Sequence, residues 1–151
     1  MMNFVRINLQ NFKDYQSDIQ NFFERNKEDY NIFHPHGFSS DEFYEEIKDK
    51  KKDLYIFLAV DEKFVGYGIL RGWDDGYEIP SLGIMIDKNG RGKGYSTSFM
   101  RYLHGEAIKK GSKKVRLAVF KENKVAISLY NKLGYEFSEK NEKELIGIKN
   151  L

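Results

Sequence analysis

The glycine-rich run Arg91-Gly92-Lys93-Gly94-Tyr95-Ser96 is the stretch of this chain whose residue types could do chemistry. It follows an apolar strand pattern at Ile84-Met85-Ile86 and leads into a helical pattern, which predicts a strand, a turn and a helix. Small residues let the backbone approach a ligand, and a helix N-terminus offers unpaired N–H groups and the positive end of its dipole. This arrangement is typical of a phosphate-binding turn, with Arg91 and Lys93 adding positive charge.

Two better-known phosphate motifs fail on this run. The dinucleotide pattern GxGxxG would place its third glycine at Tyr95 or Thr97, and the P-loop pattern GxxxxGK[ST] requires glycine where Asp87 stands. The pattern [QR]xxGx[GA] does fit, at Arg91 and Gly94, with Ser96 as a near miss. In this respect the run resembles the acyl-CoA-binding motif of the GNAT superfamily of N-acyltransferases.

A second block supports the resemblance. Residues 123–135, Asn-Lys-Val-Ala-Ile-Ser-Leu-Tyr-Asn-Lys-Leu-Gly-Tyr, are similar to the family pattern NxxAxxLYxxxGF and stand at the family's distance from the first block. The resemblance covers roughly residues 54–138. It implies the GNAT fold, an α+β fold with three layers: a central mixed, mostly antiparallel sheet with a bulged fourth strand, flanked by about four helices.

The resemblance also implies acetyl-CoA as co-substrate. Pro80 and Gly83 interrupt the fourth strand and predict a bulge, beside which backbone groups would pair with the pantetheine arm and polarise the thioester. Asn123 would hydrogen-bond the pantetheine, and its position before a helix also gives it a structural role as N-cap. The expected cofactor-binding residues are Ile84, Met85, Ile86, Arg91, Gly92, Lys93, Gly94, Tyr95, Ser96, Thr97, Asn123 and Tyr130.

Tyr130 matches the family's general acid. Its phenol, with a reference pKa of about 10, keeps a proton at neutral pH that a coenzyme A thiolate could accept. Spacing alone indicates a core tyrosine on an apolar helix face, and the resemblance reverses that interpretation. Glu78, on the strand expected to border the acceptor, is the candidate general base; a surface role for this acid, with relayed water as the base, is the alternative.

The acceptor side is expected to be polar and aromatic. Because the segment between the first two helices borders the acceptor in this fold, the candidate substrate-binding residues are His34, His36, Trp73, Tyr77 and Ser81. No nearby acid or cysteine joins the two histidines, so they do not predict a metal site. The lining favours a sugar amine, and the pattern resembles GNAT members that acetylate amino-sugar nucleotides. Protein N-termini or lysines, polyamines and aminoglycosides stay open as acceptors, as does an acyl-CoA-binding sensor domain without turnover.

Composition limits the other possibilities. The 151 residues predict a single N-acetyltransferase domain over 1–151, and the net charge of +2 argues against nucleic acid or an anionic membrane as partner. The absence of cysteine excludes a disulfide framework, a zinc ribbon and a thiol nucleophile. Neither a signal peptide nor a run long enough to span a bilayer is present, so the sequence predicts a cytoplasmic protein, with a homodimer left open.

Periodicity predicts the elements that must position these residues. Apolar residues three and four apart predict helices over 11–25, from a Ser39/Glu42 capping box through Ile47, from the glycine-rich turn to Gly111, and from Asn123 to Gly134. Alternating or continuous apolar runs predict strands over 3–9, 54–60, 64–70, 77–86, 115–119, 135–137 and 145–148. The glycine-rich turn therefore follows the fourth strand.

Overall fold

The computed structural model describes residues 1–151 as one seven-stranded sheet with helices on both faces. The strand order is β1-β2-β3-β4-β5-β7-β6, and only β4 and β5 are parallel. The strands are β1 (Met2–Arg6), β2 (Leu54–Val60), β3 (Lys63–Arg71), β4 (Ser81–Ile86), β5 (Lys114–Phe120), β6 (Glu136–Glu139) and β7 (Glu144–Asn150). The helices are α1 (Phe12–Arg25), α2 (Ser40–Ile47), α3 (Tyr95–Lys109) and α4 (Lys124–Lys132), with 3₁₀ helices η1 (Lys27–Asn31) and η2 (Lys88–Gly90).

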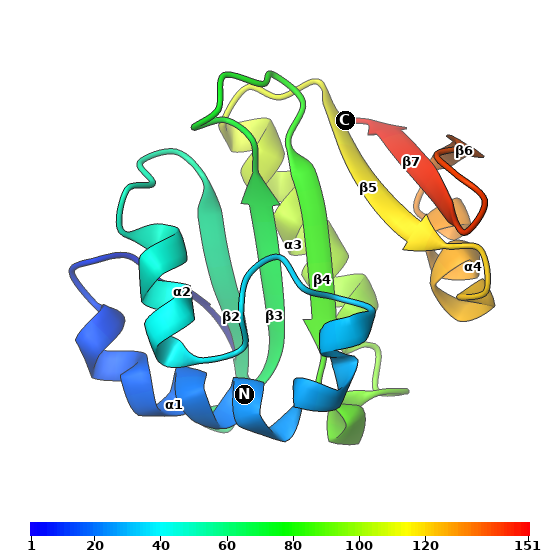
Figure 1. Ribbon diagram of the computed structural model, residues 1–151. Coiled ribbons are helices and arrows are strands. Elements are labelled where there is room, and N and C mark those ends of the chain that lie inside the picture. Colours follow the sequence, from blue (N-terminus) through cyan, green and yellow to red (C-terminus); the bar gives the residue numbers. More distant parts are fainter.

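The helices cover the two faces of the sheet unequally. In Figure 1, α1, α2 and η1 lie in front of the sheet over β1 to β4, and α3 lies behind it. Each face has its own apolar cluster: the front cluster contains Phe23 and Phe43, and the rear cluster contains Phe99 and is joined by side chains of α4. No helix covers the front of β5, β7 and β6 (Figure 1). The predicted three-layer α+β arrangement with a mostly antiparallel sheet is confirmed.

The hairpin of β2 and β3 is predicted correctly. Its two-residue turn consists of Asp61 and Glu62, whose φ angles of 51° and 68° match the left-handed conformation that such turns require. β2 is continuously apolar because both of its faces are buried, with Phe57 in the front cluster and Leu58 in the rear one. A register shift between Leu58 and Ala59 is an additional feature that periodicity does not predict.

Side-chain hydrogen bonds set two boundaries near the N-terminus. Ser39 is the N-cap of α2, because its Oγ accepts from the Glu42 N–H at 3.1 Å, and the Glu42 side chain accepts from the Ser39 hydroxyl at 2.9 Å in place of the backbone N–H of a full capping box. The sequence predicts a first strand through residue 9, but β1 ends at Arg6. Asn8 and Asn11 end the strand: the Asn8 N–H donates to Asn11 Oδ1 at 2.8 Å, which turns the backbone away from the sheet.

A buried polar pair joins α3 to the segment that follows α4. The Tyr135 hydroxyl lies 2.7 Å from His104 Nε2, and both residues are buried. Burial and, to a smaller extent, the charge of Lys149 lower the pKa of His104 to about 4. The imidazole is therefore neutral near pH 7 and is joined to the Tyr135 hydroxyl by one hydrogen bond. Where the family pattern has Phe, Tyr135 adds a hydrogen bond that ties the end of α4 to α3.

This pair predicts an acid-sensitive fold. The pKa of His104 in the folded state lies below its ordinary value of 6.5, so the unfolded chain binds a proton first as the pH falls. The contribution of His104 is complete above about pH 6.5 and declines toward pH 4. His104→Gln should lose less stability than the parent over this interval, measured as urea midpoints at each pH. Parallel pH curves for parent and variant would contradict the assignment.

Candidate active site

The glycine-rich turn presents a row of free backbone N–H groups at the start of α3. None of the amides of residues 92–97 donates a hydrogen bond within the chain, whereas Arg91 before them and Ser98 after them both do. Gly92 and Gly94 have φ angles of +78° and +80°, which glycine adopts without strain. A Cβ atom at either position would meet no atom within 4 Å, so the space in front of these amides is open. Such a row suits the oxygens of a pyrophosphate.

Ion pairs fasten this turn to the end of α1 and to η1. The pairs are Arg25–Asp87 at 3.1 Å, Arg91–Asp29 at 2.9 Å, and Lys88–Glu28. Arg91 Nε also donates to the Ile86 carbonyl at 3.3 Å, so the guanidinium is turned away from the free amides. A phosphate contact of the Arg91 side chain would have to compete with these two partners, and it stays a prediction. Lys93 is exposed and takes part in none of the chain's ion pairs, which leaves it as the free cation of the turn.

The ion pair of Arg25 should stabilise the protein more than that of Lys88. Arg25→Ala leaves the buried Asp87 carboxylate without its cation and removes a 2.8 Å bond to the Phe64 carbonyl, which costs about 1–3 kcal/mol of unfolding free energy. Lys88→Ala breaks an exposed pair and should change stability little. Urea denaturation of both variants measures the difference. Equal midpoints would contradict the distinction between the two pairs.

β4 and β5 separate after a single pair. Ser81 pairs with Arg116, whose N–H donates to the Pro80 carbonyl at 3.0 Å, and no further pair joins the two strands. We call the space between the strands beyond this pair the strand opening. Against β3, β4 pairs continuously from Ser81 to Ile86 without a register shift. The predicted bulge is therefore absent from this pairing, and β4 instead diverges from β5.

Backbone alternation decides which residues face the strand opening. The Asp87 N–H donates to the Val65 carbonyl at 2.8 Å, so every second residue back along β4 directs its polar groups toward β3. Met85 is one of these, and its side chain lies in the front cluster, so its N–H is directed away from the strand opening. Ile84 and Ile86 direct their N–H groups into the strand opening, as expected for donors to an acyl-CoA.

The hydroxyl of Tyr130 has no partner within the chain. Three other buried tyrosines do have partners, in the pairs Tyr55–Glu46, Tyr67–His36 and Tyr135–His104. The Tyr130 hydroxyl is also not among the fully buried unpaired atoms, so it reaches accessible space. Burial of the ring raises the pKa of Tyr130 to about 12. The phenol therefore stays protonated at neutral pH and can donate a proton to a ligand.

α4 and β4 both contribute incompletely covered apolar residues to the rear cluster. No residue of α4 is buried, although three of its side chains, Ala126, Ile127 and Tyr130, pack against that cluster together with the C-cap residue Leu133. Ile84 of β4 is likewise a partly buried member of that cluster. Asn123 acts as N-cap, its Oδ1 accepting from the Ala126 N–H at 3.2 Å, and its Nδ2 donates no bond within the chain. The predicted pantetheine contact of Asn123 stays a prediction.

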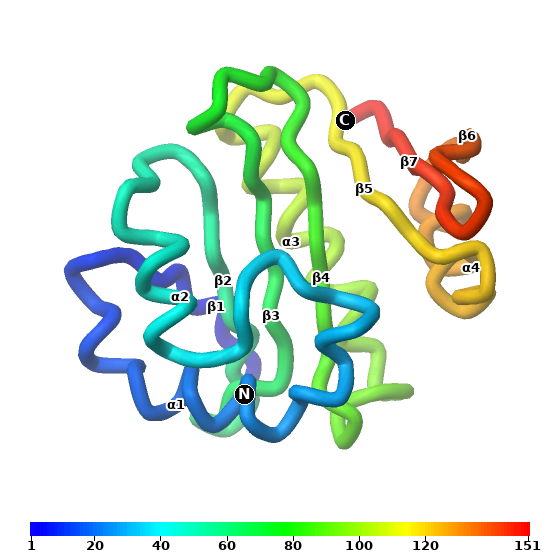
Figure 2. The backbone as a smooth tube through the Cα atoms, in the orientation of Figure 1, coloured from blue at the N-terminus to red at the C-terminus, as the bar shows by residue number.

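His34 and His36 differ in whether a ring nitrogen is free to contact a substrate. His36 uses both nitrogens, with Nε2 2.8 Å from the Tyr67 hydroxyl and Nδ1 2.7 Å from the Gly37 carbonyl, and burial lowers its pKa. His34 is exposed, and its Nδ1 donates to the Tyr30 carbonyl at 2.9 Å, which leaves a lone pair on Nε2. The segment that carries His34 crosses in front of β3 and β4 (Figure 2). Of the two histidines that the sequence predicts to bind substrate, only His34 has a ring nitrogen without a partner on the front of the sheet.

Trp73 lies behind the sheet, contrary to the prediction that it joins His34. Its Nε1 donates to Ser112 Oγ at 3.2 Å, and Lys110 Nζ lies 5.4 Å from the ring centroid. These contacts pack the indole in the rear cluster beside the end of α3. A loop tryptophan has no periodicity that would indicate which face of the sheet it joins, so the sequence could not decide between them.

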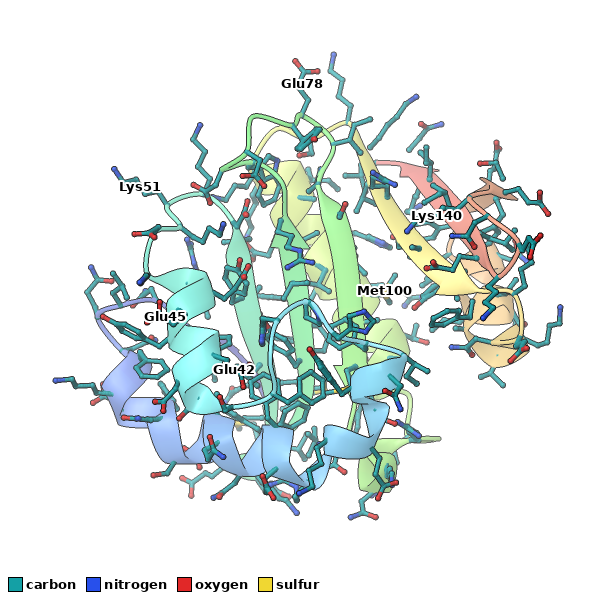
Figure 3. All side chains as sticks on the ribbon, in the orientation of Figure 1. Glu42, Glu45, Lys51, Glu78, Met100 and Lys140 are labelled. Atoms are coloured by element: carbon teal, nitrogen blue, oxygen red, sulfur yellow. The ribbon has the colours of Figure 1, made fainter.

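Glu78 and Tyr77 belong to the strand predicted over 77–86 but lie outside the observed strand β4. β4 begins only at Ser81, because Pro80 has no N–H to donate, and both residues are exposed in the preceding loop. In Figure 3 Glu78 extends upward into solvent, away from the sheet. A general base at this carboxylate would have to be partly buried beside the acceptor, and Glu78 meets neither condition. Ser81 does lie on the front face, at the closed end of the strand opening.

Sequence reasoning missed Asp29 and Phe33 as residues of the site. Asp29 is buried and holds Arg91, and a Cβ atom at Gly83 would lie 2.8 Å from the Phe33 ring. Gly83 therefore lets η1 and its following loop approach the sheet closely and does not interrupt β4. A glycine within a strand is the sequence signal that could have predicted the close contact of Phe33. Asp29 is a single acid in a polar segment, and no sequence signal indicates its partner.

The sequence profile of the Acetyltransferase (GNAT) family matches residues 19–135. The chain belongs to this family. Solved structures share the fold at low identity. Ribosomal-protein-S18-alanine N-acetyltransferase from Escherichia coli is 17% identical, with 99% of this chain and 94% of that one covered and a TM-score of 0.74. The PaiA N-acetyltransferase from Thermoplasma acidophilum, in complex with coenzyme A, is 16% identical, with 100% and 99% covered and a TM-score of 0.75.

Other GNAT structures differ in acceptor. Spermidine N-acetyltransferase from Vibrio cholerae is 13% identical, with 98% of this chain and 94% of that one covered and a TM-score of 0.74. Membership of the GNAT family makes this chain an acyltransferase with acetyl-CoA as co-substrate. The free amides of residues 92–97 and the open space before them fit the charged end of that co-substrate. No helix is long and apolar enough to cross a membrane, and no group of three or more His, Cys, Asp or Glu could hold a metal ion.

Proposed function

We propose that this GNAT enzyme transfers the acetyl group of acetyl-CoA to a primary amine of a small molecule, with an amino-sugar nucleotide as the favoured acceptor. The free amides of residues 92–97 beside the strand opening carry the proposal, because they fix where the acyl donor would lie. Aromatic side chains of the segment after η1, with His34 among them, offer a surface that suits a sugar ring.

Each step of the reaction has a candidate group. The amides of residues 92–97 and Lys93 hold the pyrophosphate, and the Ile84 N–H polarises the thioester carbonyl. The ammonium form of the acceptor loses a proton to His34 Nε2 or to water. Its nitrogen then bonds to the carbonyl carbon and loses its second proton to water, the carbon–sulfur bond breaks, and Tyr130 gives its phenolic proton to the departing thiolate. Solvent returns a proton to Tyr130.

The base differs from the one that the sequence predicts. Glu78 is exposed beyond the closed end of the strand opening, and β5 offers Arg116, Ala118 and Phe120 on its front face, none of which is a base at neutral pH. His34 and relayed water are the groups that remain. Residues 1–151 acting as one domain, a cytoplasmic location and a homodimer stay predictions.

The test is thiol release from acetyl-CoA with a panel of amines that includes 4-amino-4,6-dideoxy sugar nucleotides, aminoglycosides, spermidine and peptides with free N-termini. We expect turnover with sugar amines, and His34→Ala should raise the acceptor KM or lower kcat while calorimetric affinity for acetyl-CoA holds. Binding of acetyl-CoA without acetylation of any amine would overturn the enzymatic proposal in favour of a sensor domain. Turnover only with peptides or spermidine would overturn the sugar assignment.

A further inference from the structure

Two arginines flank Ser81 in a row across the front of the sheet. Arg71 of β3 is the register partner of Ser81 in β4, and Ser81 is the register partner of Arg116 in β5. Neighbouring strands lie about 4.8 Å apart, so the row spans about 10 Å. On β5 the alternate residues Val115 and Leu117 point into the rear cluster, so Arg116 points to the front, where α1 and α2 also lie.

The two arginines differ in their partners. Arg71 donates to the Pro35 carbonyl at 2.8 Å and lies 3.5 Å from the Glu46 carboxylate, so its charge is compensated. Arg116 is exposed and takes part in none of the chain's ion pairs or side-chain hydrogen bonds. No acid adjoins it on this face: Ala118 follows along β5, Ile148 lies opposite on β7, and Lys114, which precedes it on β5, is a second cation. Glu136, in the same row on β6, is about 10 Å away across two strands.

The uncompensated charge of Arg116 lies at the closed end of the strand opening. The Ile84 N–H, which is the proposed donor to the thioester, follows Ser81 by three residues and thus by about 10 Å along β4. Figure 1 shows no helix in front of β5, so the guanidinium and the strand opening face the same open side. A molecule whose amine reaches the thioester from this side therefore passes within reach of Arg116.

We infer that the acceptor carries an anionic group, a phosphate or a carboxylate, which Arg116 binds several bonds away from the amine that is acetylated. This inference rests on the proposed function and deepens it. Arginine binds such groups through paired N–H donors, and an acceptor with a second cation, such as a polyamine, would meet repulsion at the same place. The phosphates of a sugar nucleotide satisfy this requirement.

Matched acceptor pairs test the inference. One arm compares glucosamine 6-phosphate with glucosamine, and the other compares 4-aminobutanoate with butylamine, so that phosphate and carboxylate are tested separately. In at least one arm, kcat/KM should be at least about tenfold higher for the member that carries the phosphate or carboxylate. Arg116→Gln should remove about ten- to a hundredfold of kcat/KM for that member and change the member without such a group less than about threefold, because one charge-assisted contact is lost.

Lys114→Gln is the matched control. Lys114 lies on the same strand and face, is also exposed without an ion pair, and is about 7 Å farther from the strand opening. It should keep the anion preference, and calorimetry should give both variants the parental affinity for acetyl-CoA. Equal rates within both pairs, or the same loss in Lys114→Gln, would overturn the inference while leaving the acetyltransferase proposal standing. If acetyl-CoA binds and no amine is acetylated, both the inference about Arg116 and the acetyltransferase proposal are wrong.

Discussion

Tyr130→Phe should lower turnover about a hundred- to ten-thousandfold and leave affinity for acetyl-CoA unchanged. The substitution removes only the hydroxyl, and this hydroxyl makes no hydrogen bond within the chain, so no protein contact is lost with it. The ring keeps its packing against Tyr135, whose centroid lies 5.6 Å away. Steady-state kinetics, calorimetry with acetyl-CoA and thermal melts of parent and variant measure the three quantities.

The pH dependence of kcat is a second test of Tyr130 as the general acid. Burial raises the pKa of Tyr130 to about 12, so the acid form required for proton donation persists through about pH 10 and is lost only above that. The parent's kcat should therefore show no alkaline decline assignable to Tyr130 below about pH 10. Without the raised pKa, the reference value of about 10 would place the decline within the measurable range.

Tyr102→Phe serves as the control for removal of a tyrosine hydroxyl. Tyr102 stacks on Phe4 at a centroid distance of 4.0 Å, next to β1 and far from the strand opening in the sheet order. Removal of the Tyr102 hydroxyl should leave kcat within about twofold of the parent. If Tyr130→Phe retains full turnover and melts at a lower temperature, Tyr130 is a core residue and the thiolate takes its proton from water.

Local patterns predicted the elements because each depends on neighbouring residues. The N-cap bond between Ser39 and Glu42, the hairpin at Asp61 and Glu62, and the free amides after Arg91 all follow from residue types within a few positions. Pro80, which has no N–H to donate, marks the start of the fourth strand in the same local way. Periodicity therefore accounts for the scaffold and for the anion-binding turn.

Contacts between distant surface residues could not be predicted in this way. Arg91 matches the family motif, but its partner Asp29 lies 62 positions earlier in a segment without periodicity. Trp73 and Glu78 belong to one loop, and the loop composition does not indicate that the indole turns to the rear cluster while the carboxylate enters solvent. Such choices depend on how the finished layers dock, so the acceptor side was predicted less well than the donor side.

Gly94→Val should weaken acetyl-CoA binding by roughly ten- to several-hundredfold. The φ angle at this N-cap position is +80°, and no atom lies within 4 Å of a Cβ built there, so a side chain would occupy the space that the phosphates require. A valine that shifted the backbone to relieve its strain would also redirect the neighbouring free amides. Calorimetric titration with acetyl-CoA measures the loss, and circular dichroism verifies that the fold is retained.

Gly76→Val separates strain from ligand exclusion. Gly76 also has a positive φ, +89°, and also has no atom within 4 Å of its Cβ position, but it lies in the exposed loop between β3 and β4. Both variants should lose similar stability, about 1–3 kcal/mol, because valine adopts this conformation only under strain. Only Gly94→Val should lose affinity for acetyl-CoA. Equal affinities in the two variants would mean that the free amides of residues 92–97 are not the phosphate site, and the placement of acetyl-CoA along β4 would have to be abandoned with it.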